Sequence, residues 1–221
     1  MSPTQTIETE PTRTQSFADW LQLNSRALTI GLVVVALGGA GYWFYLRSNE
    51  IKRTNAERGL NQAKQSLSAG NAALAQSDLQ KVADRYKGTP AGAQAALILA
   101  QLDFDQAKVP DGLKVLEPYQ TSRAGGPMLA SVWALTGDGQ LASGKPADAA
   151  ASYRKAAEAT KLPGESAMYT ARQARALSLA GKDGEARDLW KKLVDDPNAA
   201  SVQTEARVRL GELSSKPAGK S

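Results

Sequence analysis

A phosphate-binding loop is the first chemistry that the residues suggest. The segment GQLASGK at 139–145 has the glycine and lysine spacing of such a loop. A working loop also needs Ser or Thr directly after the lysine, to hold magnesium, and a β-strand before the first glycine. Pro146 follows the lysine here, and Gly144 with Lys145 is simply the start of a sequence repeat. We therefore expect no nucleotide site in this segment.

Metal binding and acid–base catalysis also find few candidates. Asp103 and Asp105 are two residues apart, so on a helix they point in different directions, and we expect both to be solvated. Asp195 and Asp196, directly before Pro197, are typical of a turn. The chain has no histidine and no cysteine, which removes the commonest general base and metal ligands. No Ser–Lys pair stands out, and we expect no catalytic residue, no metal ligand and no cofactor.

The charged residues do not point to a nucleic-acid partner. The net charge is +5 at pH 7, and basic residues alternate with acidic ones, as on solvated helix faces. They form no basic stripe of the kind that follows a phosphate backbone. Binding of nucleic acid is therefore not expected.

One long apolar segment near the start predicts a membrane anchor. ALTIGLVVVALGGAGYWFYL at 27–46 has twenty residues without a charge, and about 20 such residues cross a hydrocarbon core about 30 Å thick. A cleavable signal peptide would have a shorter apolar region behind a basic start, whereas Glu8, Glu10 and Asp19 precede this one. We predict a retained transmembrane helix in a lipid bilayer. Its aromatic residues at 42–45 mark the C-terminal boundary.

Small residues within this segment predict contact with another membrane helix. Close approach of helices in lipid needs small side chains, and Gly31, Ala36, Gly38 and Ala40 supply them. Glycine and alanine are also common in spanning helices that have no such partner. Both interpretations stay open.

A repeat of 37 residues organises the rest of the sequence. Four segments begin at Gly70, Ala107, Gly144 and Gly181. The residue five positions in is always small: Ala75, Gly112, Ala149, Ala186. The residue nine positions in is always bulky and apolar: Leu79, Leu116, Tyr153, Trp190. Offsets of five and nine lie on one helical face, Pro or Gly follows near offset 18–20, and a second helical stretch completes each unit. Two helices per fixed period predict a helical solenoid.

The predicted fold is therefore all-α, with one N-terminal transmembrane helix followed by a solenoid of helical hairpins. We expect a disordered tail at 1–15, an amphipathic juxtamembrane segment at 16–26, the transmembrane helix at 27–46, the solenoid at 47–213 and a disordered tail at 214–221. The helices of the solenoid are expected at 54–69, 71–87, 91–106, 110–121, 127–143, 145–161, 165–180, 182–195 and 199–213.

One predicted helix contains an unfavourable sequence. Gly137 and Gly139 flank Asp138, and each glycine in a helix interior costs about 1 kcal/mol relative to alanine. Either the helix is kinked there, or close packing excludes a side chain. The sequence leaves both explanations open.

The repeats resemble tetratricopeptide repeats. The segment LASGKPADAAASYRKAAEAT at 141–160 matches best, with Gly144, Ala149, Tyr153 and Ala157 at the usual places. The period here is 37 residues, where the family's is 34, and the first two units match less well. The resemblance implies a tetratricopeptide-like solenoid that binds protein partners.

The layout of the whole chain resembles a narrower family. SFADWLQLNSRALTIGLVVVALGGAGYWFY at 16–45 runs from an amphipathic segment into a Gly-rich span that ends in aromatics, and the polar helix NAERGLNQAKQSL at 55–67 follows. This is similar to bacterial inner-membrane proteins with a short cytoplasmic tail, one span and a periplasmic tetratricopeptide-like domain, among them the ancillary subunit of the Sec translocon. The resemblance implies a non-catalytic adaptor that meets the translocon and either exported chains or periplasmic chaperones.

An accessory structural subunit of another membrane complex is the alternative. Such a complex could be respiratory, photosynthetic or concerned with envelope assembly, and the solenoid would then hold one permanent partner. An enzyme is the least favoured interpretation.

The basic residues after the span conflict with this orientation. Arg47, Lys52, Arg53, Arg58 and Lys64 follow it, and basic flanks usually face the cytoplasm. The rule is weaker for long domains, which translocate largely regardless of charge. We follow the resemblance and expect a cytoplasmic N-terminus and a periplasmic C-terminal domain.

A binding groove is the expected functional site. In solenoids of this kind the first helix of each unit lines the concave side. Within the helices expected at 127–143 and 165–180, Trp133, Tyr169, Arg172 and Arg175 could face the groove, and such side chains dominate binding at interfaces. Trp133 and Tyr169 could equally be core residues, and the two arginines could merely solvate a face.

Overall fold

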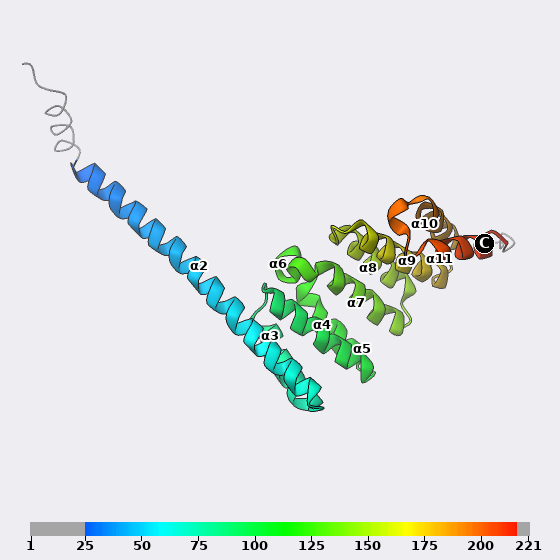
Figure 1. The fold of residues 1–221 in the computed structure, drawn as a ribbon, viewed down its shortest axis with the longest axis horizontal. Helices are drawn as coiled ribbons and strands as arrows, with labels where there is room; N and C mark the ends of the chain where they lie inside the picture. Colours follow the sequence, from blue (N-terminus) through cyan, green and yellow to red (C-terminus); the bar gives the residue numbers. More distant parts are fainter. Residues whose placement is uncertain (1–24, 216–221) are drawn as a thin grey trace, which may run out of the picture. The chain divides into compact units, whose positions relative to one another are not determined.

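The computed structural model describes residues 25–215, and every regular element within that range is helical (Figure 1). The all-α prediction is therefore confirmed. The α-helices are α2 Ser25–Ser68, α3 Ala72–Arg85, α4 Pro90–Asp105, α5 Val109–Leu116, α6 Ser122–Gly125, α7 Leu129–Ala142, α8 Pro146–Ala159, α9 Pro163–Leu179, α10 Asp183–Asp195 and α11 Gln203–Ser215. Three short 3₁₀ helices join them: η1 Glu117–Tyr119, η2 Gly126–Met128 and η3 Pro197–Ala199.

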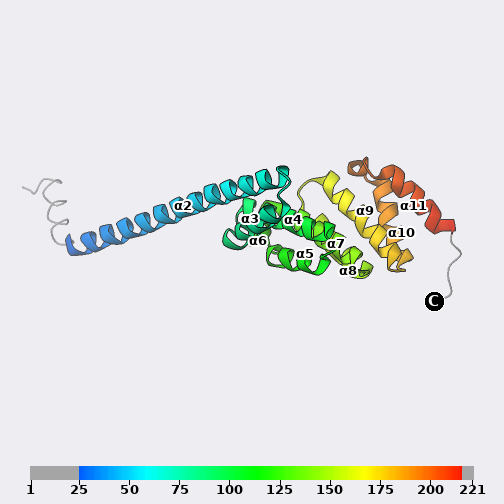
Figure 2. The same cartoon turned by 90° about the horizontal axis from the view of Figure 1, so that it is seen from below.

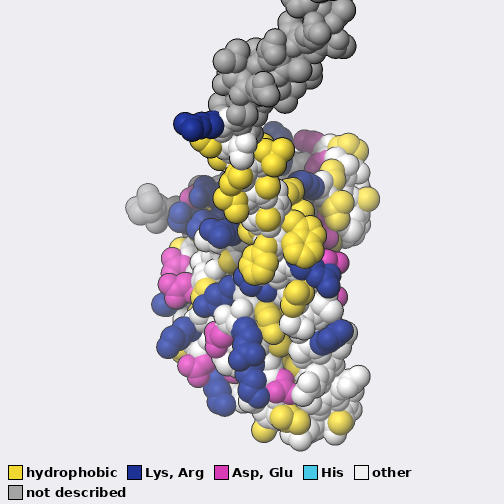
Figure 3. All heavy atoms as spheres, turned by 90° about the vertical axis from the view of Figure 1, so that its left-hand side faces the viewer, with side chains coloured by type: hydrophobic (Ala, Val, Ile, Leu, Met, Phe, Trp, Pro, Cys, Tyr) yellow, Lys and Arg dark blue, Asp and Glu magenta, His cyan; other side chains and the backbone are white. Residues whose placement is uncertain are grey.

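The chain divides into two units between Ile51 and Lys52. The first contains the apolar part of α2, where the hydrophobic side chains are exposed, for example Val35 at 75% and Leu37 at 69%. Figure 3 shows hydrophobic side chains gathered on this helix, whereas charges of both signs are mixed over the rest of the visible face. By length and composition, α2 is the one helix among residues 25–215 that could cross a membrane.

The predicted contact surface of this helix is open. A Cβ atom added at Gly31 or Gly38 would meet no atom within 4 Å, and Ala36 and Ala40 are exposed. Packing against another membrane helix remains a prediction. The tail at 1–15 and most of the amphipathic segment at 16–26 lie outside the described residues.

Two expected helices are one. The spans predicted at 27–46 and 54–69 both belong to α2, which continues through RSNEIKR at 47–53. That stretch has no Pro or Gly to end a helix, and Arg47 pairs with Glu50 one turn later at 3.4 Å. At the other end of the chain, α11 runs to Ser215, two residues beyond its predicted end.

The unit from Lys52 onward is a stack of helical hairpins, in which each helix from α3 to α11 contacts the next principal helix in the chain (Figures 1 and 2). The repeat positions form its core as predicted: all eight small and bulky residues are buried. Buried hydrophobic residues gather in two clusters, one between Ala56 and Val132 and one between Ala149 and Leu213.

The first residue of each repeat makes the turn inside a hairpin. Gly70, Ala107, Gly144 and Gly181 have positive φ angles of 76°, 60°, 71° and 76°. In each turn the next residue donates its N–H to the carbonyl five residues earlier, as Lys145 does to Gln140 at 2.9 Å. This is the Schellman ending of a helix. The GQLASGK segment is therefore a helix end with its turn.

Helix α7 is continuous through its two glycines, because close packing leaves no room for side chains there. A Cβ atom at Gly137 would lie 2.7 Å from the Tyr153 ring, and one at Gly139 would lie 2.5 Å from the Phe104 ring. Of the two explanations left open by the sequence, the structure supports close packing. Asp138, between the two glycines, is half-buried.

Two helix boundaries differ from expectation for local reasons. The helix expected at 110–121 ends as α5 at Leu116, because Pro118 has no N–H to donate and its ring clashes with the preceding turn. The helix expected at 199–213 begins only at Gln203, because η3 occupies Pro197–Ala199.

Candidate partner-binding face

Helices α7 and α9 are the first helices of two successive hairpins, and α11 is the next principal helix after the second hairpin. Two cavities lie between α7, α9 and α11. The smaller, about 260 Å³, lies between α7 and α9. The larger, about 340 Å³, lies between α9 and α11. Tyr153 of α8 lines the smaller cavity and Trp190 of α10 the larger, and these are the equivalent bulky residues of two repeats. Arg175 lines both cavities. We call this surface the first-helix face.

Asp138 is the centre of the smaller cavity's polar network. It accepts a hydrogen bond from the Tyr153 hydroxyl at 2.6 Å, and the Arg172 Nη1 contacts both of its oxygens, at 3.1 and 3.2 Å. Burial and the hydrogen bond to Asp138 raise the pKa of Tyr153. The phenol therefore stays protonated and acts as a donor, and the network as a whole is neutral.

Glu205 plays the same part beside the larger cavity. Its carboxylate receives two hydrogen bonds from Arg175, the one from Nε at 2.5 Å. That hydrogen bond lowers the pKa of Glu205 and raises the pKa of Arg175. The Nε atom of Arg209 lies 3.9 Å from the Glu205 Oε1 atom, and its Nη1 atom lies 2.9 Å from the Glu212 Oε2 atom. The charges around this cavity are thus paired.

The interior of the larger cavity is apolar. Trp190 and Leu213 are buried beneath it, and Leu179 at its wall is 69% exposed. The charges at the rim are paired, and the apolar floor can bury an apolar side chain. The arrangement suits the binding of an apolar side chain from another chain segment.

The comparisons with known proteins agree with this fold. A family model described as a tetratricopeptide repeat-like domain matches residues 18–124 and 58–170, which together are more than half of the chain. The chain belongs to the tetratricopeptide repeat-like family. Domains of this family are typically protein-interaction scaffolds without a catalytic site.

Solved structures show the same fold at low sequence identity. Two crystal structures of tetratricopeptide-like repeats from a Podospora anserina protein, described as a kinesin light chain, match with TM-scores of 0.52. One is a point variant with 15% identity, covering 73% of this chain and 94% of its own; the other has 14% identity, covering 76% and 99%. No curated protein matches this tetratricopeptide-like chain.

The predicted binding residues of this tetratricopeptide-like domain fall in different places. Arg172 and Arg175 meet at the smaller cavity. Tyr169 is half-buried on α9, just before Arg172. Trp133 is half-buried on α7, and the Lys155 ammonium nitrogen of α8 lies over its ring, 4.0 Å from the ring centre. The structure therefore brings the two arginines together and places Trp133 against α8. Their role in binding stays a prediction.

Several residues of this face were not predicted as site residues. Asp138, Glu205 and Leu179 carry no motif that marks them. One signal was available: the bulky repeat position is leucine in the first two units and aromatic in the last two, Tyr153 and Trp190. Both aromatic residues are buried core, as expected, and they also form the cavity floors.

Proposed function

We propose that this chain is a non-catalytic adaptor, anchored in the bacterial inner membrane by α2, and that it is an ancillary subunit of the protein-export machinery. Its first-helix face would hold an exported chain, or a periplasmic chaperone that receives one, close to the membrane. The apolar, exposed first part of α2 supports the anchor, and family membership supports partner binding. The resemblance of the chain's layout supports the link to export.

The larger cavity on the first-helix face is the observation that carries this proposal. A newly exported chain has not yet buried its apolar side chains, and the cavity offers an apolar floor of Trp190 with Leu179 at its wall. Burying one leucine-sized side chain there would contribute about 1.5–3 kcal/mol. Because the surrounding charges are already paired, the cavity suits uncharged segments and requires no particular sequence. Such weak, general binding is what an adaptor for many clients needs.

The orientation is tested with topology reporters. Alkaline phosphatase and a fluorescent protein are fused in turn after Ser221. Active phosphatase with a dark fluorescent fusion is expected for a periplasmic domain. The reverse pattern would mean that the basic flank sets the orientation, and the export role would be abandoned.

Client binding is tested with a photocrosslinker and two matched variants. A photoreactive residue at Ser178 should crosslink to a secretory chain arrested during export. Leu179→Glu should reduce this crosslink severalfold, because it places a charge at the wall of the apolar cavity. Leu162→Glu is the control, since Leu162 is also exposed, at 59%, but lies outside both cavities of the first-helix face.

Two results would contradict the proposal. Equal loss in the two variants would mean that the cavity is not the binding site. A crosslink to one resident membrane subunit in every case, with none to the arrested chain, would favour the accessory structural subunit.

A further inference from the structure

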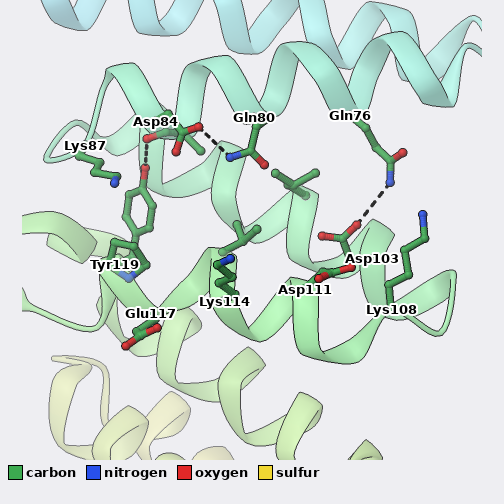
Figure 4. Close-up of a pocket in the computed structure, with 14 residues that line it drawn as sticks. Gln76, Gln80, Asp84, Lys87, Asp103, Lys108, Asp111, Lys114, Glu117 and Tyr119 are labelled. Carbon is green, nitrogen blue, oxygen red and sulfur yellow. Dashed lines mark hydrogen bonds between the residues drawn. The ribbon is translucent and has the colours of Figure 1, made fainter.

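A third cavity lies away from the first-helix face. It is a groove of about 700 Å³ between the second helices α3 and α5, with α4 behind it (Figure 4). Ten of its fourteen lining residues have polar or charged side chains. The residues are Gln76, Gln80, Ala83, Asp84, Lys87, Leu99, Asp103, Lys108, Asp111, Lys114, Val115, Glu117, Pro118 and Tyr119.

One end of this groove holds a carboxylate in an unfavourable setting. Asp103 was expected to be solvated but is only 8% exposed, because α4 turns it towards the space between α3 and α5. It accepts a long hydrogen bond, 3.4 Å, from Gln76. Figure 4 shows Asp111 of α5 beside it. Burial and the nearby Asp111 charge both raise the pKa of Asp103.

The dipole of α4 further disfavours the negative charge of Asp103, and Lys108 offsets only part of this effect. Asp103 lies in the last turn of α4, where the helix dipole disfavours negative charge. Lys108 lowers the pKa of Asp103, as the smallest of the three effects, and its ammonium group is hydrogen-bonded to Gln106 at 2.9 Å. Two carboxylates thus share this end of the groove with one lysine that is also engaged elsewhere.

The remaining charges lie farther along the groove. Lys114 projects from α5 near the middle, and Lys87 lies at the far end beside Tyr119 (Figure 4). Asp84 accepts a hydrogen bond from Gln80 at 2.8 Å, and Glu117 lines the opposite wall. Four carboxylates therefore face three lysines, and the buried one of the seven is a carboxylate.

We propose that this groove is a second binding site, which takes an extended polypeptide segment and holds an arginine of that segment between Asp103 and Asp111. A guanidinium group is planar, always charged and rich in donors, so it can bond two carboxylates at once. It would also add to the weak counter-charge that Lys108 gives Asp103. The Gln76 amide nitrogen already donates to Asp103, so the acceptor of this side chain is its Oε1 atom.

The shape of the groove indicates that the arginine belongs to a chain. Gln76 and Lys87 lie at opposite ends. The nine residues from Gln76 to the end of α3 at Arg85 span about 14 Å at 1.5 Å per helical residue, and Lys87 lies two residues farther on. About five extended residues, at about 3.3 Å each, span this distance. The Gln80 side chain lies between the ends, where its amide can meet the backbone of an extended segment. This site does not depend on the proposed function of the first-helix face.

The experiment uses the full chain in detergent and one defined probe. The probe is a dye-labelled pentapeptide, Ser-Ala-Arg-Ala-Ser, with blocked ends, and binding is followed by fluorescence anisotropy. A second peptide with Gln in place of Arg should bind about tenfold or more weakly, because the charge-assisted hydrogen bonds are lost. Asp103→Asn and Asp111→Asn should each weaken binding of the Arg peptide by a similar factor.

The control variant is Asp105→Asn. Asp105 is on the same helix but is exposed, bonds Gln101 and does not line the groove, so this variant should bind as the wild type does. Thermal unfolding followed by circular dichroism verifies that each variant is folded. Leu179→Glu, on the first-helix face, should leave the pentapeptide affinity unchanged, which separates this site from the proposed client site.

Several outcomes would overturn the inference. Equal binding of the Arg and Gln peptides would remove the charge argument, and a loss in Asp105→Asn as large as in Asp103→Asn would remove the assignment to the groove. Calcium binding that requires Asp103 and Asp111, without binding of the Arg peptide, would identify a cation site instead. A pH titration adds a further arm: affinity for the Arg peptide should fall as pH decreases through the raised pKa of Asp103.

Discussion

Replacing Ala107 with glycine should stabilise the domain. Ala107 has φ of 60°, and it occupies the turn position at which the other three repeats have glycine. An L-residue in this left-handed region is disfavoured by about 1–2 kcal/mol because its Cβ crowds the following carbonyl oxygen. Glycine removes that cost, but it also increases the freedom of the unfolded chain, which offsets about 0.4–1 kcal/mol. The net gain should be about 0.5–1 kcal/mol.

The reverse substitution is the matched test. Gly144 has φ of 71°, and a Cβ atom there would meet no atom within 4 Å. Gly144→Ala therefore changes the backbone preference without a clash, and it should destabilise the domain by about 0.5–1 kcal/mol. Gly184→Ala, also in open space but without a positive φ, should be neutral or slightly stabilising.

Thermal unfolding of the full chain in detergent, followed by circular dichroism, measures all three variants. For a domain of this size, 1 kcal/mol shifts the midpoint by about 2–4 °C. Ala107→Gly should raise the midpoint and Gly144→Ala should lower it. If Ala107→Gly lowers the midpoint, or if the two shifts have the same sign, the backbone explanation of the repeat start is wrong.

Three further predictions concern the packing and the ion pairs. Gly137→Ala would bring a Cβ within 2.7 Å of the Tyr153 ring, so it should destabilise by about 1–3 kcal/mol in urea unfolding; an unchanged urea midpoint would mean that the ring moves aside freely. Trp190→Ala should cost about 3–5 kcal/mol in the same assay, because the ring is only 1% exposed. Arg175 lowers the pKa of Glu205 from 4.5, so the stability it contributes is present above pH 4.5 and is lost as pH falls through the lowered pKa. Glu205→Gln should therefore flatten the acid side of a plot of unfolding midpoint against pH, and a plot parallel to wild type would contradict the pairing.

The repeat made most of the fold predictable. A fixed period indicates where one helix must approach another, so small residues such as Gly112 and bulky ones such as Leu116 could be assigned to the core from the pattern alone. The same period placed the hairpin turns, because a helix ends most easily at a residue that adopts positive φ. These features depend on neighbours in sequence, and sequence patterns record such neighbours well.

Helix continuity was harder to predict. The change from apolar to polar residues near Arg47 marks a change of solvent, and nothing in it requires the helix to stop. The prediction of two helices assumed that a change from an apolar to an aqueous environment also requires the helical backbone to end. The predicted end of α5 was wrong for the opposite reason, because Pro118 breaks a helix and lay inside the predicted one.

The sites depend on residues that are distant in sequence. Asp138 meets Arg172, which is 34 residues away, and Asp103 bonds Gln76 of the preceding hairpin, 27 residues away. Spacing on one helix correctly separated Asp103 from Asp105, but it could not show that α3 and α5 would enclose the first and leave the second in solvent. Burial of this kind is determined by the stacking of hairpins, and it cannot be predicted from the sequence of a single hairpin.

The two core clusters give the stack a natural line of division. One ends at Val132 and the other begins at Ala149, and stacked repeats contact mainly their neighbours, so stability in such proteins is held in separable blocks. The groove between α3 and α5 belongs to the first block, and the Trp190 cavity belongs to the second. Loosening of the block formed by α8 to α11, by heat or by a tightly bound client, would therefore leave the groove between α3 and α5 folded. Such a protein would release a partner from the Trp190 cavity while a partner in the groove between α3 and α5 stays bound.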